Sequence, residues 1–439
     1  MSVFGTSGIR GPVGETVTAQ TALAVGRALA SDGADRVVVG RDPRETGSML
    51  VDAVSAGLRE CGADVIDVGV AATPTIARGV NWKGADAGVS VTASHNPPQD
   101  NGLKLWNPSG MAFDTAQRAQ ISDRVTEGRF DLVGWTDVGA CRRWEGADAR
   151  HVAAITDAVE PPADPPHVIV DVGTGAGGVT VDALRALGCH VETLNEGPDG
   201  AFPARPSEPT AEHCTTLQAT VANTDADLGV AHDGDADRLM AVDETGAFLA
   251  GDVLLALFAQ ASDADRVVMP VNTSLAVADA LDIEPAYTRV GDVFVAERAH
   301  AVDADFGGEP SGAWIWPAET LCPDGPLAAA KLVTLVAQEG PLSALADTIE
   351  SYPIRRESHA VAEKTAIIEA VASLAAEQYD AIDDRDGVRI EFEDGWLLLR
   401  ASGTEPVVRL TAEARAESRA DDLLQRGRTL LERAQELID

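Results

Sequence analysis

Lysine is almost absent from this sequence: only four of its 34 basic residues are lysines, and the others are arginines. The 70 acidic residues outnumber the basic ones and leave a formal net charge of −36 at pH 7. A field of that sign repels phosphate backbones and anionic membranes, so we expect no nucleic-acid partner and no membrane partner. A carboxylate-rich surface also suits concentrated salt, which screens the repulsion between like charges, and it indicates a halophilic protein.

Cysteine is scarce as well. The five cysteines are an odd number and none lies in a CxxC spacing, which argues against a disulfide framework or zinc site and favours a reducing compartment. No apolar run approaches the roughly 20 residues of a membrane-spanning helix, and the first residues lack a basic-then-apolar leader. We therefore expect a soluble protein of the cytoplasm.

The rest of the composition is that of a globular chain. Hydrophobic residues make up 45% of it, with 41 glycines and 23 prolines spread along the sequence. At roughly 100–200 residues per domain, 439 residues predict about three domains, give or take one.

A pattern of strand, helix, strand and strand occurs three times. Each copy opens with an apolar, β-branched run that is typical of a buried parallel strand, at residues 36–42, 167–173 and 266–272. A helical stretch and a second strand follow, and a third strand ends in polar, glycine-rich sequence. Beyond residue 352 the pattern changes to a helix, several strands and a long closing helix.

These patterns predict an α/β protein with three domains of similar mixed topology, in which βαβ-type sheets are covered by helices, and a smaller C-terminal α+β domain. The domains are expected at residues 1–145, 146–245, 246–350 and 351–439. In such sheets ligands bind beyond the carboxyl ends of the strands. The three glycine-rich segments stand at those ends and are the first candidates for a functional site.

The segment DGDADR follows the predicted strand LGVAH and places three carboxylates, Asp233, Asp235 and Asp237, at every second position. In extended backbone these side chains can share one side and offer hard oxygen ligands to a divalent cation, Mg²⁺ rather than zinc. An EF-hand calcium loop is disfavoured because Arg238 stands where that loop needs glycine. A solvated acidic turn is the plain alternative; Arg238 favours a metal site, since it adds a cation where a metal-bound phosphate would lie.

The segment TASHNP follows another predicted strand and presents Ser94 beside His95 in a proline-terminated turn. An exposed serine on such a turn can act as a nucleophile when a metal or base activates it. The absence of GxSxG disfavours an α/β-hydrolase, and a serine-histidine pair is more often a capping turn. Lys104, ten residues on, is a candidate acid or base, with an ordinary solvated amine as the alternative.

A glycine-rich turn competes with these signals. Gly173, Gly175 and Gly178 have the GxGxxG spacing between a strand and a helix, with Glu192 and Glu196 roughly 20 residues on. This favours a dinucleotide site and hence an NAD(P)-dependent oxidoreductase. The glycines also suit a tight turn between strand and helix, and no hydride-transfer constellation of His or Arg is evident.

Three further segments are weak when taken singly. GGEPSG presents Glu309 and Ser311, which suit sugar hydroxyls, although a Pro-Gly turn explains them as well. RASGTEP, from Arg400, combines a guanidinium, two hydroxyls and backbone N–H groups, as a phosphate cradle does. FGTSGIRG carries Arg10 on a glycine-flanked loop.

Taken in order, FGTSGIRG, TASHNP, DGDADR, GGEPSG and RASGTEP resemble the motifs of the α-D-phosphohexomutase family of phosphoglucomutases, phosphomannomutases and phosphoglucosamine mutases. The resemblance spans essentially the whole chain and implies four domains around a central cleft. It implies an enzyme that interconverts hexose 6-phosphate and hexose 1-phosphate through a phosphoserine and a bisphosphate intermediate. RVGDVFV and CPDG look closest to archaeal-type phosphoglucosamine mutases, with phosphomannomutase or phosphoglucomutase as the alternative.

The resemblance implies a role for each matching position. Ser94 matches the phosphoserine, and its phosphoryl group would join the three aspartates in holding one Mg²⁺ per active site. Lys104 matches the proposed general acid/base, and the groups that flank the transferred phosphoryl are His95, Arg10 and Arg238. The sugar-selecting positions are Glu309 and Ser311, and those that bind the substrate's own phosphate are Arg400, Ser402, Gly403 and Thr404.

The implied partners are small sugar phosphates, with a hexose 1,6-bisphosphate as intermediate and activator, and we expect a monomer or homodimer. One position departs from the family pattern. Many members have histidine after the sugar-loop glycine, whereas Ala313 and Trp314 follow here, so any contact made by that histidine is missing or replaced.

Two other classes would use the same residues. A metal-dependent phosphatase needs the same serine, metal and arginines but passes the phosphoryl group to water. A non-catalytic sugar-phosphate sensor would bind ligand and never phosphorylate Ser94.

Overall fold

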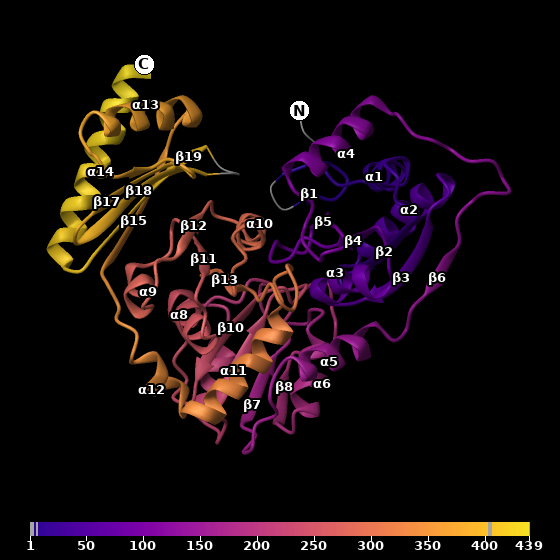
Figure 1. Cartoon of the computed structure of the whole chain (residues 1–439), viewed down its shortest axis with the longest axis horizontal. Coiled ribbons are helices and arrows are strands. Elements are labelled where there is room, and N and C mark those ends of the chain that lie inside the picture. Colours follow the sequence, from indigo (N-terminus) through magenta and orange to yellow (C-terminus); the bar gives the residue numbers. More distant parts are fainter. Residues whose placement is uncertain (1–3, 6–7, 403–405, 439) are drawn as a thin grey trace.

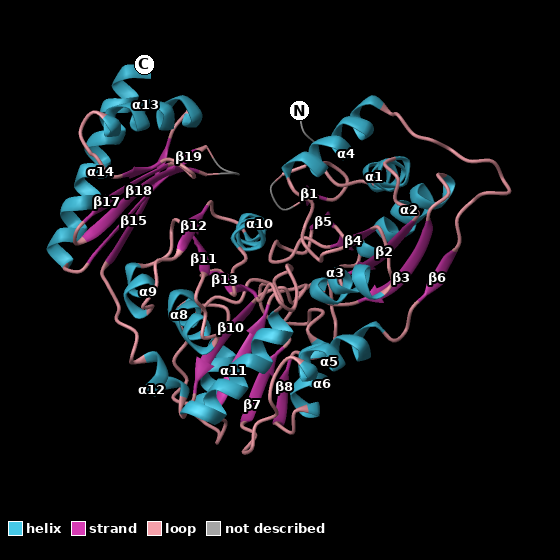
Figure 2. Cartoon of the chain, viewed as in Figure 1, coloured by secondary structure: helices cyan, strands magenta, loops and turns pink. Residues whose placement is uncertain are grey.

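The computed structural model of the chain describes residues 4–5, 8–402 and 406–438. Four lobes follow one another around an arc, with the N-terminal lobe at one end and the C-terminal lobe at the other (Figure 1). Helices cover the sheets of the lobes, as the colours of Figure 2 show. Within the described residues, no helix is both long enough and apolar enough to cross a membrane.

The N-terminal lobe is built on a six-stranded sheet with the order β1-β5-β4-β2-β3-β6. Its strands are β1 (Ile9–Pro12), β2 (Arg36–Arg41), β3 (Asp64–Val70), β4 (Ala87–Val91), β5 (Asp100–Trp106) and β6 (Cys141–Arg143). Its helices are α1 (Ala19–Ser31), α2 (Gly47–Glu60), α3 (Thr73–Trp82) and α4 (Thr115–Glu127). Strand β2 lies in the middle of the sheet because its three consecutive valines are buried on both faces.

The next two lobes each hold a four-stranded sheet. The second lobe has β7 (His167–Asp171), β8 (His190–Leu194), β9 (Leu228–His232), β10 (Leu239–Asp243), α5 (Ala147–Asp157), α6 (Gly178–Ala186) and α7 (Thr215–Ala222). The strands of the third are β11 (Val267–Pro270), β12 (Ala286–Thr288), β13 (Phe306–Glu309) and β14 (Ala313–Ile315). Its helices are α8 (Gly251–Ala261), α9 (Leu275–Ala280), α10 (Asp292–Val302), α11 (Gly325–Glu339) and α12 (Leu342–Ala346).

The same four-strand arrangement recurs in all three sheets. In each sheet, the first of four successive strands lies between the second and the third and is parallel to both. The fourth strand runs antiparallel beside the third. These sets of four are β2 to β5, β7 to β10 and β11 to β14. The threefold repeat predicted from the sequence is confirmed. The polar segments predicted at strand ends follow β4 and β9 and include the end of β13.

The C-terminal lobe has an all-antiparallel sheet of five strands with the order β15-β19-β18-β17-β16. Its elements are β15 (Ile354–Ala360), α13 (Lys364–Ala376), β16 (Ile382–Asp383), β17 (Val388–Phe392), β18 (Gly395–Ala401), β19 (Val407–Ala414) and α14 (Glu417–Ile438). Helix α14 packs a stripe of leucines onto this sheet. The predicted α+β character is confirmed, whereas the exact domain limits stay predictions.

Buried polar contacts join three of the lobes around Asp324, which caps the start of α11. Its carboxylate accepts a hydrogen bond from Arg78 Nε of α3 at 2.7 Å and lies 3.1 Å from His151 Nε2 of α5. Burial raises the pKa of Asp324, but the nearby His151 ring and Arg78 guanidinium outweigh it and hold the pKa below its usual range. The ionised carboxylate therefore stabilises the junction of the lobes.

We predict that Asp324→Asn lowers the free energy of unfolding by about 3–5 kcal/mol at pH 7, because the Arg78 charge stays buried without its partner. Since folding lowers the pKa of Asp324, this contribution is complete above the unfolded value near 4 and is lost as the pH falls further. Denaturant unfolding between pH 3 and 7 measures both effects. Parallel pH profiles for variant and wild type would contradict the assignment.

Candidate active site

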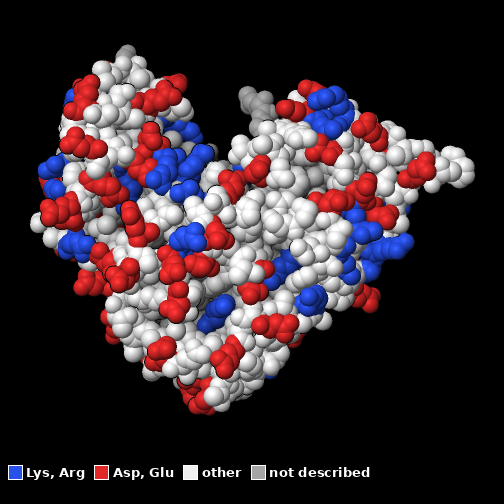
Figure 3. Space-filling model, in the orientation of Figure 1, with Lys and Arg blue, Asp and Glu red and all other residues white. Residues whose placement is uncertain are grey.

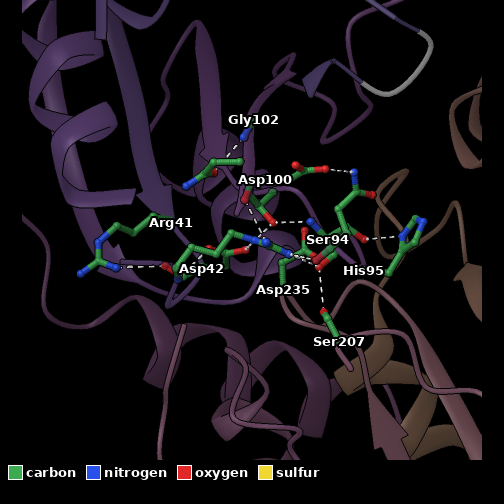
Figure 4. A network of polar contacts seen from close by, with 12 residues as sticks. Arg41, Asp42, Ser94, His95, Asp100, Gly102, Ser207 and Asp235 are labelled. Atoms are coloured by element: carbon green, nitrogen blue, oxygen red, sulfur yellow. Dashed lines mark hydrogen bonds and ion pairs between the residues drawn. The ribbon is translucent and has the colours of Figure 1, made fainter. Parts of the chain in front are cut away.

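The turn that carries Ser94 is held in an unusual conformation. Ser94 follows β4 with φ at +52°, the left-handed region that costs a non-glycine residue roughly 1–3 kcal/mol. The buried Arg44 guanidinium donates to the carbonyls of Ser94 at 2.9 Å and Asn96 at 2.6 Å, and also to those of Pro97 and Asp100. Figure 4 shows this network around Ser94. Such strain at a fixed turn is a feature of functional sites.

The Ser94 side chain meets the acidic loop of the second lobe. Its hydroxyl donates to Asp233 Oδ2 at 2.6 Å and lies 3.2 Å from His95 Nδ1. The Ser94 carbonyl accepts a hydrogen bond from Ser207 Oγ at 2.9 Å, and a Cβ on Gly234 would lie 2.9 Å from the same carbonyl. The two segments, distant in the sequence, therefore pack directly against each other.

The acidic loop gathers three buried carboxylates. Oxygens of Asp233, Asp235 and Asp237 lie within 4.8 Å of one another. Burial, and next the neighbouring carboxylates of the trio, raise the pKa of each to about 6. Thr73 Oγ1, at the start of α3, donates to Asp235 Oδ2 at 2.6 Å, while Asp235 Oδ1 is buried and makes no hydrogen bond to any described residue.

This arrangement fits a hard divalent cation. Three buried carboxylates repel one another, and a buried oxygen without a partner is costly. Mg²⁺ prefers carboxylate oxygens and would relieve both costs. Asp233, Asp235 and Asp237 are therefore the residues that could hold it, and Ser94 lies within hydrogen-bond distance of the first.

Lys104 of β5 lies beside the same loop. Its ammonium donates to Asp292 Oδ2 at 2.6 Å and lies 3.4 Å from Asp237 Oδ2. Burial lowers the pKa of Lys104, but Asp292 and then Asp237 outweigh it and raise the pKa above its ordinary value. Burial likewise raises the pKa of Asp292, and Lys104 reverses this and holds the pKa at about 2. Lys104 is therefore a charged donor in this arrangement.

Two arginines surround His95 with positive charge. Burial, then Arg238 and Arg10, lower the pKa of His95 to about 2, so its ring is neutral. The backbone N–H of Arg238 donates to Asp233 Oδ1 at 3.2 Å. Arg10 Nε is buried and has no hydrogen-bond partner among the described residues. These groups are suited to an anion beside Ser94.

The sugar-loop candidates lie next to the acidic loop. Glu309, at the end of β13, accepts hydrogen bonds from the Gly291 N–H at 2.8 Å and from Ser311 Oγ at 3.0 Å. Burial raises the pKa of Glu309. Ala313 pairs with Arg238 in an isolated β-bridge, so the segment that departs from the family pattern runs directly along the acidic loop.

The phosphate-loop candidates belong to the C-terminal lobe. Arg400, on β18, donates to Asp386 at 3.3 Å, and Ser402 is buried. Asp386 also accepts a hydrogen bond from the Val290 N–H of the third lobe. Gly403 and Thr404 lie outside the described residues. The surface is hollowed between the C-terminal and N-terminal lobes, and basic side chains gather on the C-terminal side of this opening (Figure 3).

Comparison with known families gives four matches in chain order. The first three are the phosphoglucomutase/phosphomannomutase alpha/beta/alpha domains I, II and III, at residues 1–131, 149–246 and 250–352. The fourth is the C-terminal domain of the same family, at residues 358–429. The chain belongs to the phosphoglucomutase/phosphomannomutase family.

Members of this family resemble the chain over nearly its full length. A probable phosphoglucosamine mutase of Methanococcoides burtonii is 44% identical, with 94% of this chain and 96% of the relative covered. A phosphoglucomutase/phosphomannomutase of Thermococcus kodakarensis is 40% identical, with 98% and 99% covered. A solved structure of the family from Burkholderia thailandensis superposes with a TM-score of 0.88 at 30% identity, covering 99% of this chain and 98% of that one.

Several residues around the site were not singled out by the sequence. Arg44 shapes the Ser94 turn, Thr73 binds Asp235, and Asp292 binds Lys104. All three follow strands of the repeat, β2, β3 and β12. Their location just after a predicted strand could have pointed to them, but many polar residues share that location.

The GxGxxG segment also has a local explanation. A Cβ on Gly175 would lie 2.8 Å from the Gly234 carbonyl oxygen, and one on Gly173, with φ at +62°, would lie 2.5 Å from a guanidinium nitrogen of Arg205. The first two glycines of the segment therefore allow a tight turn to pack against the acidic loop and Arg205.

Proposed function

We propose that this family member is a phosphoglucosamine mutase, which interconverts glucosamine 6-phosphate and glucosamine 1-phosphate. The observation that carries the mutase reaction is the hydrogen bond from the Ser94 hydroxyl to Asp233, within a buried carboxylate trio and beside a charged lysine. A phosphomannomutase or phosphoglucomutase is the second candidate. It is favoured by the name of the Thermococcus relative, whereas the Methanococcoides relative favours glucosamine phosphate.

The reaction has two halves. In the first, a sugar hydroxyl oxygen bonds to the phosphorus carried by phospho-Ser94, the bond from phosphorus to Ser94 Oγ breaks, and a sugar bisphosphate forms. After the bisphosphate has turned around, Ser94 Oγ bonds to its other phosphorus and the sugar leaves as the isomeric monophosphate. Phosphoryl transfer of this kind depends on alignment and charge stabilisation.

The chain supplies these requirements from its first two lobes. Asp233, Asp235 and Asp237, with an oxygen of the phosphoryl group on Ser94, would hold one Mg²⁺. When bound, that ion neutralises charge on the transferred group. Arg10 and Arg238, which both act electrostatically on His95, would stabilise the same phosphoryl oxygens, and the neutral His95 ring would hydrogen-bond to them.

Lys104 serves as the proton carrier. Its ammonium donates a proton to the oxygen that leaves phosphorus, and the neutral amine then accepts the proton of the attacking hydroxyl. Asp292 acts through Lys104 by holding its Nζ in place. It is therefore a positioning residue.

Substrate contacts complete the proposal. Glu309 and Ser311 would hydrogen-bond sugar hydroxyls, and Arg400, Ser402, Gly403 and Thr404 would bind the phosphate that is not being transferred. A ligand would enter through the hollow between the C-terminal and N-terminal lobes (Figure 3).

We predict that Asp292→Asn lowers kcat by about 10–100-fold with little change in KM, because Lys104 loses its nearest anion while the ground-state sugar contacts remain. The pH profile of kcat should also shift to lower pH, since removal of that anion lowers the pKa of Lys104. Asp303→Asn, an exposed aspartate just after α10, is the matched control. A purely structural role for Asp292 predicts loss of folded protein without a shifted profile.

The function itself is tested by assaying the 1- and 6-phosphates of glucosamine, glucose and mannose with Mg²⁺, a trace of hexose 1,6-bisphosphate and concentrated salt. We expect the highest kcat/KM for glucosamine phosphates. A higher value for glucose or mannose phosphates would select the second candidate. Release of free phosphate in step with substrate loss would show a phosphatase instead.

A further inference from the structure

A second cluster of metal-ligating side chains lies on the second lobe, away from the site described above. Strands β7 and β8 are parallel, and their register places His167 opposite His190. Glu192 stands two residues after His190 and so projects from the same face of the sheet. His167 and His190 are the first residues of β7 and β8, whereas Asp233 follows the carboxyl end of β9, which is parallel to β7. The cluster and the acidic loop thus lie toward opposite ends of the strands of one sheet.

The three side chains are arranged as ligands rather than as a hydrogen-bonded pair. One ligand atom of each residue lies within 4.8 Å of the others. His167 Nε2 is 3.2 Å from Glu192 Oε1, and the two imidazole rings are 4.2 Å apart between centroids. Yet His167 Nε2 is buried and makes no hydrogen bond to any described residue.

That spacing is close to what a zinc ion imposes. Metal–ligand distances of about 2.0–2.2 Å in a tetrahedron put ligand atoms roughly 3.3 Å apart. The contact between His167 and Glu192 already has this length. His190 and Glu192 are exposed, so their side chains are free to rotate by the small amount that would bring all three ligand atoms to this spacing.

The other ring nitrogen of His167 also has a carboxylate neighbour. His167 Nδ1 lies 3.4 Å from Asp225 Oδ1, which belongs to the turn between α7 and β9. A histidine that binds a metal commonly donates its second ring N–H to a carboxylate, which fixes the ring and raises its basicity. The backbone N–H of His167 is also held, by Asp227 Oδ2 at 2.8 Å.

We propose that His167, His190 and Glu192 form a binding site for one divalent transition-metal ion of the zinc type, with Asp225 orienting His167. Two imidazoles and one carboxylate suit such an ion and distinguish this site from the all-carboxylate trio, which suits Mg²⁺. Strand β8 is the edge strand of its sheet. The ion links strand β8 to its neighbour β7 and stabilises the lobe without taking part in phosphoryl transfer.

The test measures Zn²⁺ binding by calorimetry and by the visible absorption of bound Co²⁺, with excess Mg²⁺ to fill the acidic loop. Concentrated sodium nitrate replaces chloride, because chloride itself binds zinc. We expect one equivalent to bind saturably, to raise the unfolding temperature and to give the strong visible band of four-coordinate Co²⁺.

His190→Gln and Glu192→Gln should each lower the affinity by at least about 100-fold, and Asp225→Asn by about 10-fold. His300→Gln, an exposed histidine near the end of α10, is the control and should bind as the wild type does. None of these variants should change Mg²⁺-dependent turnover.

Equal affinity in His190→Gln and wild type, or a weak octahedral Co²⁺ spectrum, would overturn the proposal. Circular dichroism of each variant without added zinc shows whether it is folded. If His190→Gln fails to fold, Glu192→Gln, which alters an exposed side chain, decides the question alone.

Discussion

Replacing Ser94 with alanine is expected to lower mutase turnover by more than about 10⁴-fold and to leave the protein folded. The hydroxyl is the only group on the Ser94 turn that touches the carboxylate trio through a hydrogen bond in the described structure, with Asp233 as its acceptor at 2.6 Å. Without it, no oxygen remains there to carry the phosphoryl group between the two halves of the reaction. Added hexose bisphosphate should not rescue the variant, because the bisphosphate has no acceptor.

Intact-mass analysis gives a second readout. Wild-type protein incubated with hexose 1,6-bisphosphate should gain one phosphoryl group, and peptide mapping should place it on Ser94. Ser109→Ala, an exposed serine of the same lobe that bonds only to Asn107 in the described structure, is the matched control and should keep both label and turnover. Full turnover in Ser94→Ala, or a phosphoryl group on another residue, would refute the proposed nucleophile.

The folded state of Ser94→Ala follows from where the turn obtains its stability. Its left-handed backbone is fixed by Arg44 and Ser207, which bind the Ser94 carbonyl and not its side chain. The variant loses one hydrogen bond to the buried Asp233 carboxylate, a loss of roughly 1–3 kcal/mol. The change in turnover and the change in unfolding free energy are therefore separable.

Sequence periodicity predicted the architecture well because each repeat is locally encoded. Runs such as Val37–Val39 can be buried only in the middle of a sheet, and each run is followed by a segment with helical spacing. The antiparallel edge strands were harder to predict. Strand β15, for example, has alternating rather than continuous burial and pairs with β19, far along the chain.

The sequence predicted those parts of the candidate site whose residues lie in one short segment. It missed those parts that depend on contacts between residues far apart in the chain. The aspartate trio is visible in DGDADR because three carboxylates recur at every second residue. The hydrogen bond between Lys104 and Asp292 joins residues 188 positions apart, and nothing in either segment predicts that contact. The left-handed turn at Ser94 is likewise invisible, because Arg44 imposes it from another loop.

The second large effect is expected for Asp235→Asn. We predict that Mg²⁺-dependent turnover falls by about 10³-fold, equivalent to roughly 4 kcal/mol of transition-state stabilisation. Asp235 contributes the buried Oδ1 that has no hydrogen-bond partner in the described structure, so no hydrogen bond competes with a cation for this oxygen. Calorimetric titration with Mg²⁺ should show weaker binding, and Asp199→Asn, an exposed aspartate of the same lobe, should bind as the wild type does.

The same substitution should make the metal-free protein more stable. Folding raises the pKa of Asp235 to about 6, chiefly by burial and then by repulsion from Asp233, so its ionised form destabilises the fold at neutral pH. The amide removes this penalty, worth roughly 1–3 kcal/mol, and can still accept the hydrogen bond from Thr73.

The sign of the pH dependence separates this effect from a general gain in stability. A group whose pKa is raised by folding contributes favourably below its unfolded value and loses that contribution as the pH rises through the folded value. In chelator-treated protein, the advantage of Asp235→Asn over wild type should therefore grow between about pH 4 and 6 and level off above it. Saturating Mg²⁺ should reverse the order, because the ion stabilises the wild-type trio more strongly. Equal stability of the two metal-free proteins at every pH would show that the ionised Asp235 carries no penalty from burial and repulsion, and the argument from that penalty for a cation would fall.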